Sequence, residues 1–150
     1  MKANRRTVLQ TSGAMATLVA LGIVTAQQAH AASRPGFEAR SLQDALRAVG
    51  GTPATSAQIR IVSPDIAENG AVVPVGVAST LPNTTEIFIL VEQNPVPMAA
   101  SFAIVQGTEP DIQTRIRMGQ SSNIVAVARA DGRLFSAVKE TKVTLGGCGG

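Results

Sequence analysis

Apolar residues between positions 37 and 49 recur at intervals of three and four, which is the period of an amphipathic helix. Ser41 precedes the first turn and Asp44 follows three residues later, a pairing typical of a helix N-terminus. The Gly-Gly-Thr-Pro segment at 50–53 then interrupts the pattern. The sequence therefore predicts one short helix at the start of the folded region. Its apolar positions are Phe37, Leu42, Ala45, Leu46 and Val49.

After Pro53 the apolar period changes to two, which indicates half-buried strands. Residues 86–91 are apolar on both faces and predict a central strand, whereas Pro74 predicts that its own strand lies at a sheet edge. Residues 101–105 predict a further strand. The alternating positions form three groups: Ile59 and Ile61; Val73, Val75 and Val77; and Ile112, Thr114, Ile116 and Met118.

The strongest turn signal is Asp131-Gly132, between apolar segments at 123–130 and 133–138, and it predicts a β-hairpin whose second strand continues over 139–145. About seven short strands separated by Pro-, Asn- and Gly-rich turns predict an all-β fold. We expect an immunoglobulin-like antiparallel β-sandwich with a short N-terminal helix and a flexible C-terminal arm. The proline-rich segment 92–98 is interpreted as a loop between two strands, or as part of a partner-binding edge.

Residues 4–10, with the pair Arg5 and Arg6, are typical of a twin-arginine (Tat) export signal. An uncharged apolar stretch over 11–26 and the small-x-small motif Ala29-His30-Ala31 follow, so cleavage is expected after Ala31 or Ala32. An ordinary secretory signal or a single membrane anchor is the alternative, but the stretch is short for a spanning helix. We therefore predict a signal peptide at 1–31, a periplasmic location and no membrane association after cleavage.

The net charge of +3 comes from 13 basic and 10 acidic residues. Lys2, Arg5 and Arg6 lie in the predicted signal and no acidic residue does, so the remaining chain carries 10 basic and 10 acidic side chains. A neutral chain without Trp or Tyr does not have the clustered basic and aromatic residues of a nucleic-acid-binding protein. The sequence thus predicts no nucleic-acid partner.

Removal of the signal also removes His30, the only histidine, and leaves Cys148 as the only cysteine. Without histidine, the chain cannot form a Ser-His-Asp or Cys-His catalytic pair. Zinc and related metals need several thiolate or imidazole ligands, and no acidic segment has the spacing of a calcium loop. We therefore expect no metal, no bound cofactor and no enzymatic activity of the chain on its own.

Cys148 lies between two pairs of glycines, Gly146 and Gly147 before it and Gly149 and Gly150 after it. Glycine gives this segment, 145–150, backbone freedom and no side-chain bulk, and four extended residues span roughly 10–14 Å. Such a thiol suits a swinging arm that carries a covalent cargo into the clefts of other proteins. A disulfide tether to a partner subunit is the main alternative, and an inert free cysteine is another.

Several segments resemble the Y-subunit family of the bacterial Sox sulfur-oxidising system, SoxY. The most specific one is the glycine-enclosed cysteine, and the resemblance covers essentially the whole chain, including its twin-arginine signal. The resemblance implies an immunoglobulin-like domain over 32–144 and identifies Cys148 as the covalent attachment site. The segments that carry it are 63–70, 72–75, 92–102 with its Asn94-Pro95 turn, 133–139, 143–145 and 146–150.

The same resemblance implies the cargo and the partners. The heme-containing SoxAX proteins are expected to join thiosulfate oxidatively to the cysteine as an S-thiosulfonate, and SoxB to hydrolyse off sulfate. SoxCD, where present, would oxidise the remaining sulfane, and a SoxZ subunit would form a heterodimer with this chain. A ubiquitin-like sulfur carrier also ends in Gly-Gly, but its thiocarboxylate requires ATP, which an exported protein lacks, and Cys148 would have no role in it.

Overall fold

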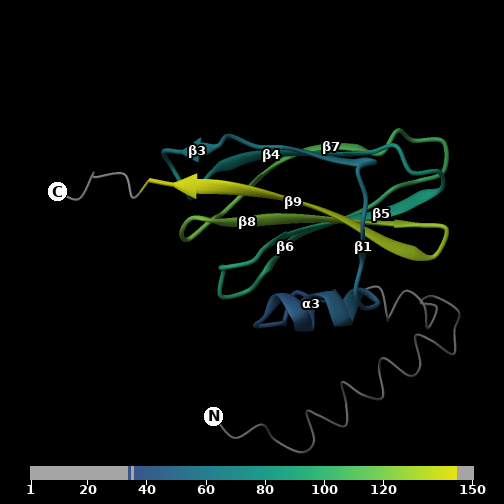
Figure 1. Cartoon of the computed structure of the whole chain (residues 1–150), viewed down its shortest axis with the longest axis horizontal. Coiled ribbons are helices and arrows are strands. Elements are labelled where there is room, and N and C mark those ends of the chain that lie inside the picture. The colour runs from purple at the N-terminus through teal and green to yellow at the C-terminus, as the bar shows by residue number, and fades with distance from the viewer. Residues whose placement is uncertain (1–33, 35, 145–150) are drawn as a thin grey trace, which may run out of the picture. The chain divides into compact units, whose positions relative to one another are not determined.

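The computed structural model describes residue 34 and residues 36–144. The chain divides into two units, residues 1–34 and 35–150, and the description below concerns the second (Figure 1). The predicted signal with Arg5 and Arg6, and the predicted arm with Gly146, Gly147, Cys148, Gly149 and Gly150, lie outside the described residues. Among the described residues, no helix is long and apolar enough to cross a membrane.

The predicted helix is confirmed as α3, Leu42–Val49. The Ser41 side chain accepts a hydrogen bond from the backbone N–H of Asp44 at 3.1 Å, which satisfies one of the free donors of the first turn. Gly50 adopts a φ of 129° after the last turn, a conformation that favours glycine, and its N–H bonds back to Arg47. Ala45 and Val49 form the buried face of the helix.

In the described part of the chain, nine strands form two sheets. The six-stranded sheet has the order β1-β9-β8-β5-β6, with β3 pairing to β9, and the three-stranded sheet has the order β2-β4-β7. The short strands β1 and β3 run parallel to β9, and all other pairs are antiparallel. The strands are β1 (Ala54–Thr55), β2 (Ile59–Val62), β3 (Ile66–Ala67), β4 (Val73–Ser79), β5 (Thr84–Val91), β6 (Met98–Ala103), β7 (Asp111–Ile116), β8 (Ser122–Ala130) and β9 (Arg133–Val143).

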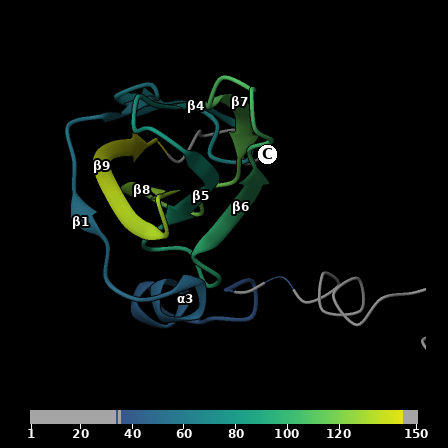
Figure 2. The same cartoon turned by 90° about the vertical axis from the view of Figure 1, so that its right-hand side faces the viewer.

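The sheets and the helix form three layers with the larger sheet in the middle (Figures 1 and 2). One apolar cluster fills the space between the two sheets, and Ile87 and Ile89 of β5 lie fully buried in it. A second cluster lies between the larger sheet and α3, where Phe88 and Leu90 of β5 contact the helix side. Alternate residues of one strand thus serve both clusters, and each such side chain contributes about 1.5–3 kcal/mol when buried.

The all-β sandwich is confirmed, and so are its two strongest local signals. Residues 86–91 lie in β5 between β8 and β6, as the apolar run predicts for a central strand. Asp131 and Gly132 have φ values of 49° and 73° and connect β8 to β9, which is the backbone of a type I′ hairpin turn.

The edge position predicted for the strand of Pro74 is wrong, because β4 is the middle strand of the smaller sheet. Pro74 pairs with Arg115 of β7, but β2 pairs only with residues 76–79 of β4, so one side of the backbone at Pro74 has no partner strand there. The strand predicted over 101–105 begins earlier, at Met98, directly after the buried Pro97. The two short strands β1 and β3 were not predicted.

Candidate functional site

The site predicted at Cys148 lies outside the described residues, five positions after the last residue of β9 in the sequence, so the part that can be described is the anchorage of that strand. On one side, Thr141 pairs with Ser122 of β8, and the Ser121 hydroxyl accepts a hydrogen bond from the Val143 N–H at 2.9 Å. On the other side, β3 pairs with Lys142 and Val143. The backbone of β9 is therefore held on both sides almost to the last described residue.

Parallel pairing with β3 extends this anchorage to Thr144. The N–H of Lys142 donates to the Asp65 carbonyl at 2.9 Å, and the N–H of Thr144 donates to the Ala67 carbonyl at 3.0 Å. Cys148 follows Thr144 by four residues in the sequence. The fold thus fixes the point in space from which the predicted arm begins (Figure 1).

Beneath β9, a polar cluster links the strand to the segment before β3. Thr141 is fully buried, and its hydroxyl donates to the Pro64 carbonyl at 3.0 Å. Since that bond uses its only proton, Thr141 accepts from the Ser63 hydroxyl, also at 3.0 Å. Lys139 donates to the Ser63 carbonyl at 2.6 Å and pairs with the carboxylate of Asp65 at 3.1 Å. The side chain of Asp65 is 90% exposed, so this ion pair adds little stability.

Gly70, the last residue of the segment 63–70, packs tightly against Met118 and Val143. A Cβ atom built there would lie 2.3 Å from the carbonyl oxygen of Met118 and 2.8 Å from the side chain of Val143. The Gly70 carbonyl accepts a hydrogen bond from the Met118 N–H at 2.7 Å. Glycine is required here by close approach, because any side chain would displace the connection between β7 and β8.

The loop between β5 and β6 joins this arrangement through Asn94. Its side-chain amide donates to the Arg117 carbonyl at 2.8 Å, and its oxygen accepts from the Gly119 N–H at 3.0 Å. The Gln93 N–H donates to the hydroxyl of Ser122 at 3.0 Å. The predicted loop interpretation of 92–98 is therefore confirmed, with strand β6 beginning at Met98. We call the three segments 63–70, 92–97 and 117–122 the arm collar.

The sequence did not predict the arm collar as a unit, although its segments 63–70 and 92–97 were among those that carried the family resemblance. Nothing in the sequence distinguishes Ser63, Ser121 and Thr141 from other polar residues, and only the fold brings them close to one another. One signal was present: Thr141 lies between two charged residues, Glu140 and Lys142, that are exposed in β9. A buried threonine at such a position needs a hydrogen-bond partner, here Ser63.

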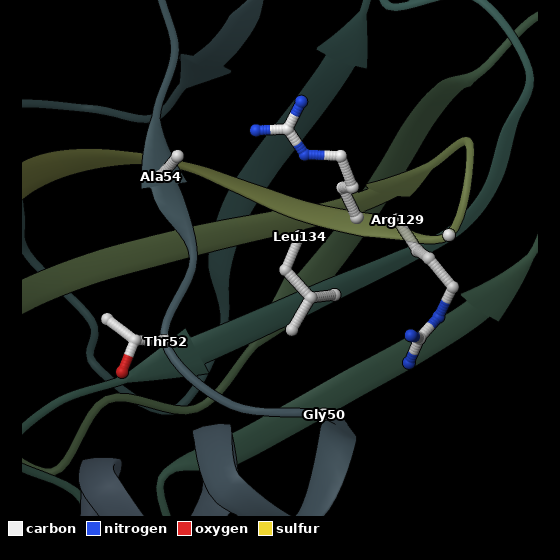
Figure 3. Close-up of a pocket in the computed structure, with 7 residues that line it drawn as sticks. Gly50, Thr52, Ala54, Arg129 and Leu134 are labelled. Carbon is white, nitrogen blue, oxygen red and sulfur yellow. The ribbon is translucent and has the colours of Figure 1, made fainter.

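A pocket of about 280 Å³ lies near the other end of β9, around the hairpin turn (Figure 3). Arg129 is already engaged there, since its guanidinium donates to the carboxylate of Glu86 and to the Val49 carbonyl. Arg133 packs over the ring of Phe135 at 5.4 Å. Arg133 and Thr144 are eleven residue steps apart along an extended strand, or about 36 Å, so the pocket is remote from the arm collar. It is lined by Gly50, Thr52, Ala54, Arg129, Gly132, Arg133 and Leu134.

Within the described ranges, no group of three or more His, Cys, Asp or Glu side chains is arranged to hold a metal ion. The fold is a small immunoglobulin-like sandwich whose last strand is held by hydrogen bonds as far as Thr144. Residues 45–148 match the family model described as sulfur oxidation protein SoxY. The match ends on Cys148 itself.

The structure is similar to that of the sulfur carrier protein SoxY from Chlorobium limicola f thiosulfatophilum. The sequence identity is 43% and the TM-score 0.64, and the similarity covers 71% of this chain and 95% of that chain. No protein with a curated description matches. The chain therefore belongs to the SoxY family.

Two structures of superoxide reductase (neelaredoxin) from Ignicoccus hospitalis share the fold alone. The first is 22% identical with a TM-score of 0.52, and the similarity covers 58% of this chain and 80% of that one. The second is 20% identical with a TM-score of 0.54, and the similarity covers 61% of this chain and 95% of that one. At these identities the likeness concerns the sandwich and says nothing about chemistry.

Proposed function

We propose that this protein is a sulfur carrier whose cargo is bound covalently to Cys148. The observation that carries the proposal is the match to the SoxY family model, which extends through residue 148. The similar structure from Chlorobium limicola is described as that of a sulfur carrier protein. The anchorage of β9 supports it, because the arm collar holds the chain through Thr144 and leaves Cys148 four residues beyond. The chain itself then serves as the substrate of partner enzymes.

The reach of the thiol follows from the covalent geometry of the chain. Four residues beyond Thr144 span at most about 14 Å when extended. We assign the bending of this arm to Gly146, Gly147, Gly149 and Gly150, which add no side-chain bulk. A partner enzyme must therefore bring its reacting group to within this distance of the arm collar.

The proposed loading step is an oxidation. The thiol of Cys148 and the outer sulfur of thiosulfate form an S–S bond, releasing one proton and two electrons and leaving a cysteine S-thiosulfonate. The electrons go to a heme partner, which the family resemblance identifies as SoxAX. Histidine is absent from the chain after His30, so we assign activation of the thiol to the partner.

The proposed unloading steps follow from the same adduct. Hydrolysis by SoxB adds one water, releases sulfate with two protons and leaves a persulfide on Cys148. SoxCD would oxidise that remaining sulfane to a sulfonate with three oxygen atoms from water, passing six electrons to its own acceptor and releasing six protons. A second hydrolysis would then release sulfate and one proton and regenerate the Cys148 thiol, and SoxZ would be the constant partner of this chain. These assignments rest on the family resemblance and complete the proposed cycle.

The test is a mass spectrum of the protein isolated from cells grown on thiosulfate, compared with a Cys148→Ser variant. We expect sulfane or thiosulfonate adducts on Cys148, and loss of thiosulfate oxidation in the variant at an unchanged thermal midpoint. A reducible dimer without adduct would instead support the disulfide tether, and added sulfur on Gly150 would support a ubiquitin-like carrier. A Cys148→Ser variant that still supports thiosulfate oxidation would refute the carrier proposal.

We also propose that the protein works in the periplasm, on the basis of the twin-arginine motif. Replacing Arg5 and Arg6 together by Lys keeps the charge and removes the arginine pair. Fractionation of cells is expected to find the variant in the cytoplasm at its uncleaved mass. Normal processing of the variant would contradict the assignment to this export route.

A further inference from the structure

The outer face of the smaller sheet lies on the side of the sandwich opposite α3 (Figure 1). The three valines of β4 are buried in the core between the sheets, so Pro74 and Gly76 of the same strand face outward. The register places Val62 of β2 and Gln113 of β7 beside Gly76. It places Arg115 of β7 beside Pro74. These residues of three strands therefore share one surface, and all of them except Gly76 are exposed.

One end of this face reaches the arm collar. Gly70, three residues before β4, accepts a hydrogen bond from the N–H of Met118, two residues after β7. Gly70 also packs against Val143 at the end of β9. Val72 and Arg117 adjoin these contacts and are exposed, so the face ends beside the last described residues of β9. We give the name basic patch to Val62, Val72, Pro74, Arg115 and Arg117.

The two arginines of the basic patch have no partner among the described residues. Neither the ion pairs nor the side-chain hydrogen bonds of that part of the chain include the guanidinium of Arg115 or Arg117. Asp111, the acidic residue of β7, is four positions from Arg115, or about 13 Å along the strand. Its carboxylate accepts a hydrogen bond from the Gln113 amide at 3.3 Å. The patch thus carries two unpaired positive charges, although residues 32–150 have no net charge.

Apolar side chains accompany these charges on a flat surface. Val62 and Val72 are each 51% exposed, and Pro74 is exposed between β2 and β7. The side chain of Gln113 lies over Gly76, where a Cβ atom would be 2.7 Å from its amide nitrogen, so the surface beside Val62 is filled. Small molecules bind in concave sites, whereas a flat surface with arginines and apolar residues is typical of protein interfaces.

We propose that the basic patch is the docking surface for an acidic rim on the enzymes that process Cys148, an inference that rests on the proposed carrier function. The reach of the arm supports it. Cys148 lies at most about 14 Å from Thr144, so an enzyme that encloses the thiol must contact residues beside the end of β9. The basic patch is in that position, since Gly70 and Met118 join it to Val143.

Charge complementarity specifies the chemistry of the partner surface. A guanidinium without a carboxylate partner forms strong paired hydrogen bonds with one on another protein. Val62, Val72 and Pro74 exclude water beside these pairs when the partner covers them. A second copy of the chain is a poor occupant, because it would bring Arg115 and Arg117 against the same positive charges.

The test measures how fast the purified heme partner of the proposed loading step joins thiosulfate to Cys148, followed by mass spectrometry. For Arg115→Glu combined with Arg117→Glu, we expect kcat/KM for the carrier to fall roughly tenfold or more at low ionic strength, with kcat unchanged. Added salt should narrow the difference, because it screens the attraction. Arg40→Glu is the matched control: this exposed arginine precedes α3 on the opposite side of the sandwich, and its replacement should leave loading unchanged.

A second pair of variants tests the apolar part of the patch. Val62→Ser is expected to lower kcat/KM several-fold. Val105→Ser removes a more exposed valine, 71% accessible, between β6 and β7 and should have no effect. Alkylation of Cys148 by iodoacetamide and the thermal midpoint should be the same in all variants, which separates docking from reactivity and folding.

The outcomes distinguish this proposal from the carrier function. If the wild type is loaded on Cys148 and the double arginine variant is loaded at the same kcat/KM, the docking proposal is refuted and the carrier function stands. A wild type that is never loaded would refute both. Loss of the SoxZ subunit from the double variant, detected by sedimentation, would assign the patch to that subunit and overturn the docking proposal.

Discussion

Replacing Thr141 by Val tests whether the polar cluster beneath β9 stabilises the end of that strand, where the proposed arm begins. The two side chains have nearly the same shape, so the change removes one hydroxyl without opening a cavity. In the structure that hydroxyl is fully buried, donates to the Pro64 carbonyl and accepts from Ser63. The variant therefore loses two hydrogen bonds and leaves two polar groups unsatisfied.

The expected loss of stability can be estimated from those two bonds. Each buried hydrogen bond contributes about 1 kcal/mol net, and an unsatisfied partner adds to the cost, which gives about 2–3 kcal/mol for Thr141→Val. For a domain of this size the thermal midpoint falls by roughly 4 °C per kcal/mol, or about 8–12 °C in total. A domain with about 5–15 kcal/mol of stability remains folded after such a loss.

Urea unfolding and amide hydrogen exchange are the assays, with Thr114→Val as the control. Thr114 lies partly buried in β7, and its side chain makes no hydrogen bond with the described residues, so its replacement should cost less than about 0.5 kcal/mol. In Thr141→Val, exchange should quicken at the amides of Lys142 and Thr144, whose acceptors lie in the segment that Ser63 begins. Adding Ser63→Ala should cost little more, because the pair is already broken. Equal stabilities of the two Thr→Val variants would refute the reasoning.

Two further predictions concern glycines, one in the folded domain and one in the predicted arm. Gly70→Ala should destabilise the domain by about 1–3 kcal/mol in urea unfolding, because its Cβ would lie 2.3 Å from the Met118 carbonyl oxygen. Gly119→Ala is the control, since its Cβ would meet its nearest neighbour at 3.8 Å, and a matching loss there would contradict the steric argument. Replacing Gly147 and Gly149 together by Val should leave folding unchanged but slow the loading of Cys148 by partner enzymes, which mass spectrometry can follow. Wild-type loading rates would show that the arm needs no such freedom.

The features that the sequence predicted correctly depend on local chemistry. Ser41, Asp44 and Gly50 define the helix ends through hydrogen bonds and a backbone conformation that involve only near neighbours. Asp131-Gly132 specifies a hairpin for the same reason, since both residues tolerate positive φ. The run over 86–91 is apolar on both faces because β5 contributes to both cores.

The features that the sequence did not predict depend on pairing between distant segments. Strands β1 and β3 are two residues long, join β9 through the backbone, and leave Ala54, Thr55 and Ile66 exposed, so their side chains show no alternation. Proline is tolerated at position 74 of a middle strand because β2 pairs only with residues 76–79 of that strand. The composition of the tail predicts a site at Cys148, but the arm collar that anchors β9 depends on contacts between segments far apart in the chain, such as that of Ser63 with Thr141.

The position of β9 within its sheet has a consequence for how the chain folds. This strand is the last described element in sequence, yet it is the hydrogen-bonded neighbour of β1, β3 and β8. Its pairing of Ala54 with Phe135 is strongly non-local, and such contacts form slowly. During synthesis from the N-terminus, the larger sheet cannot close until residues 133–143 have emerged. Because the segment that leads to Cys148 also completes the sheet, a polypeptide that stops before Arg133 lacks both Cys148 and the closed sheet.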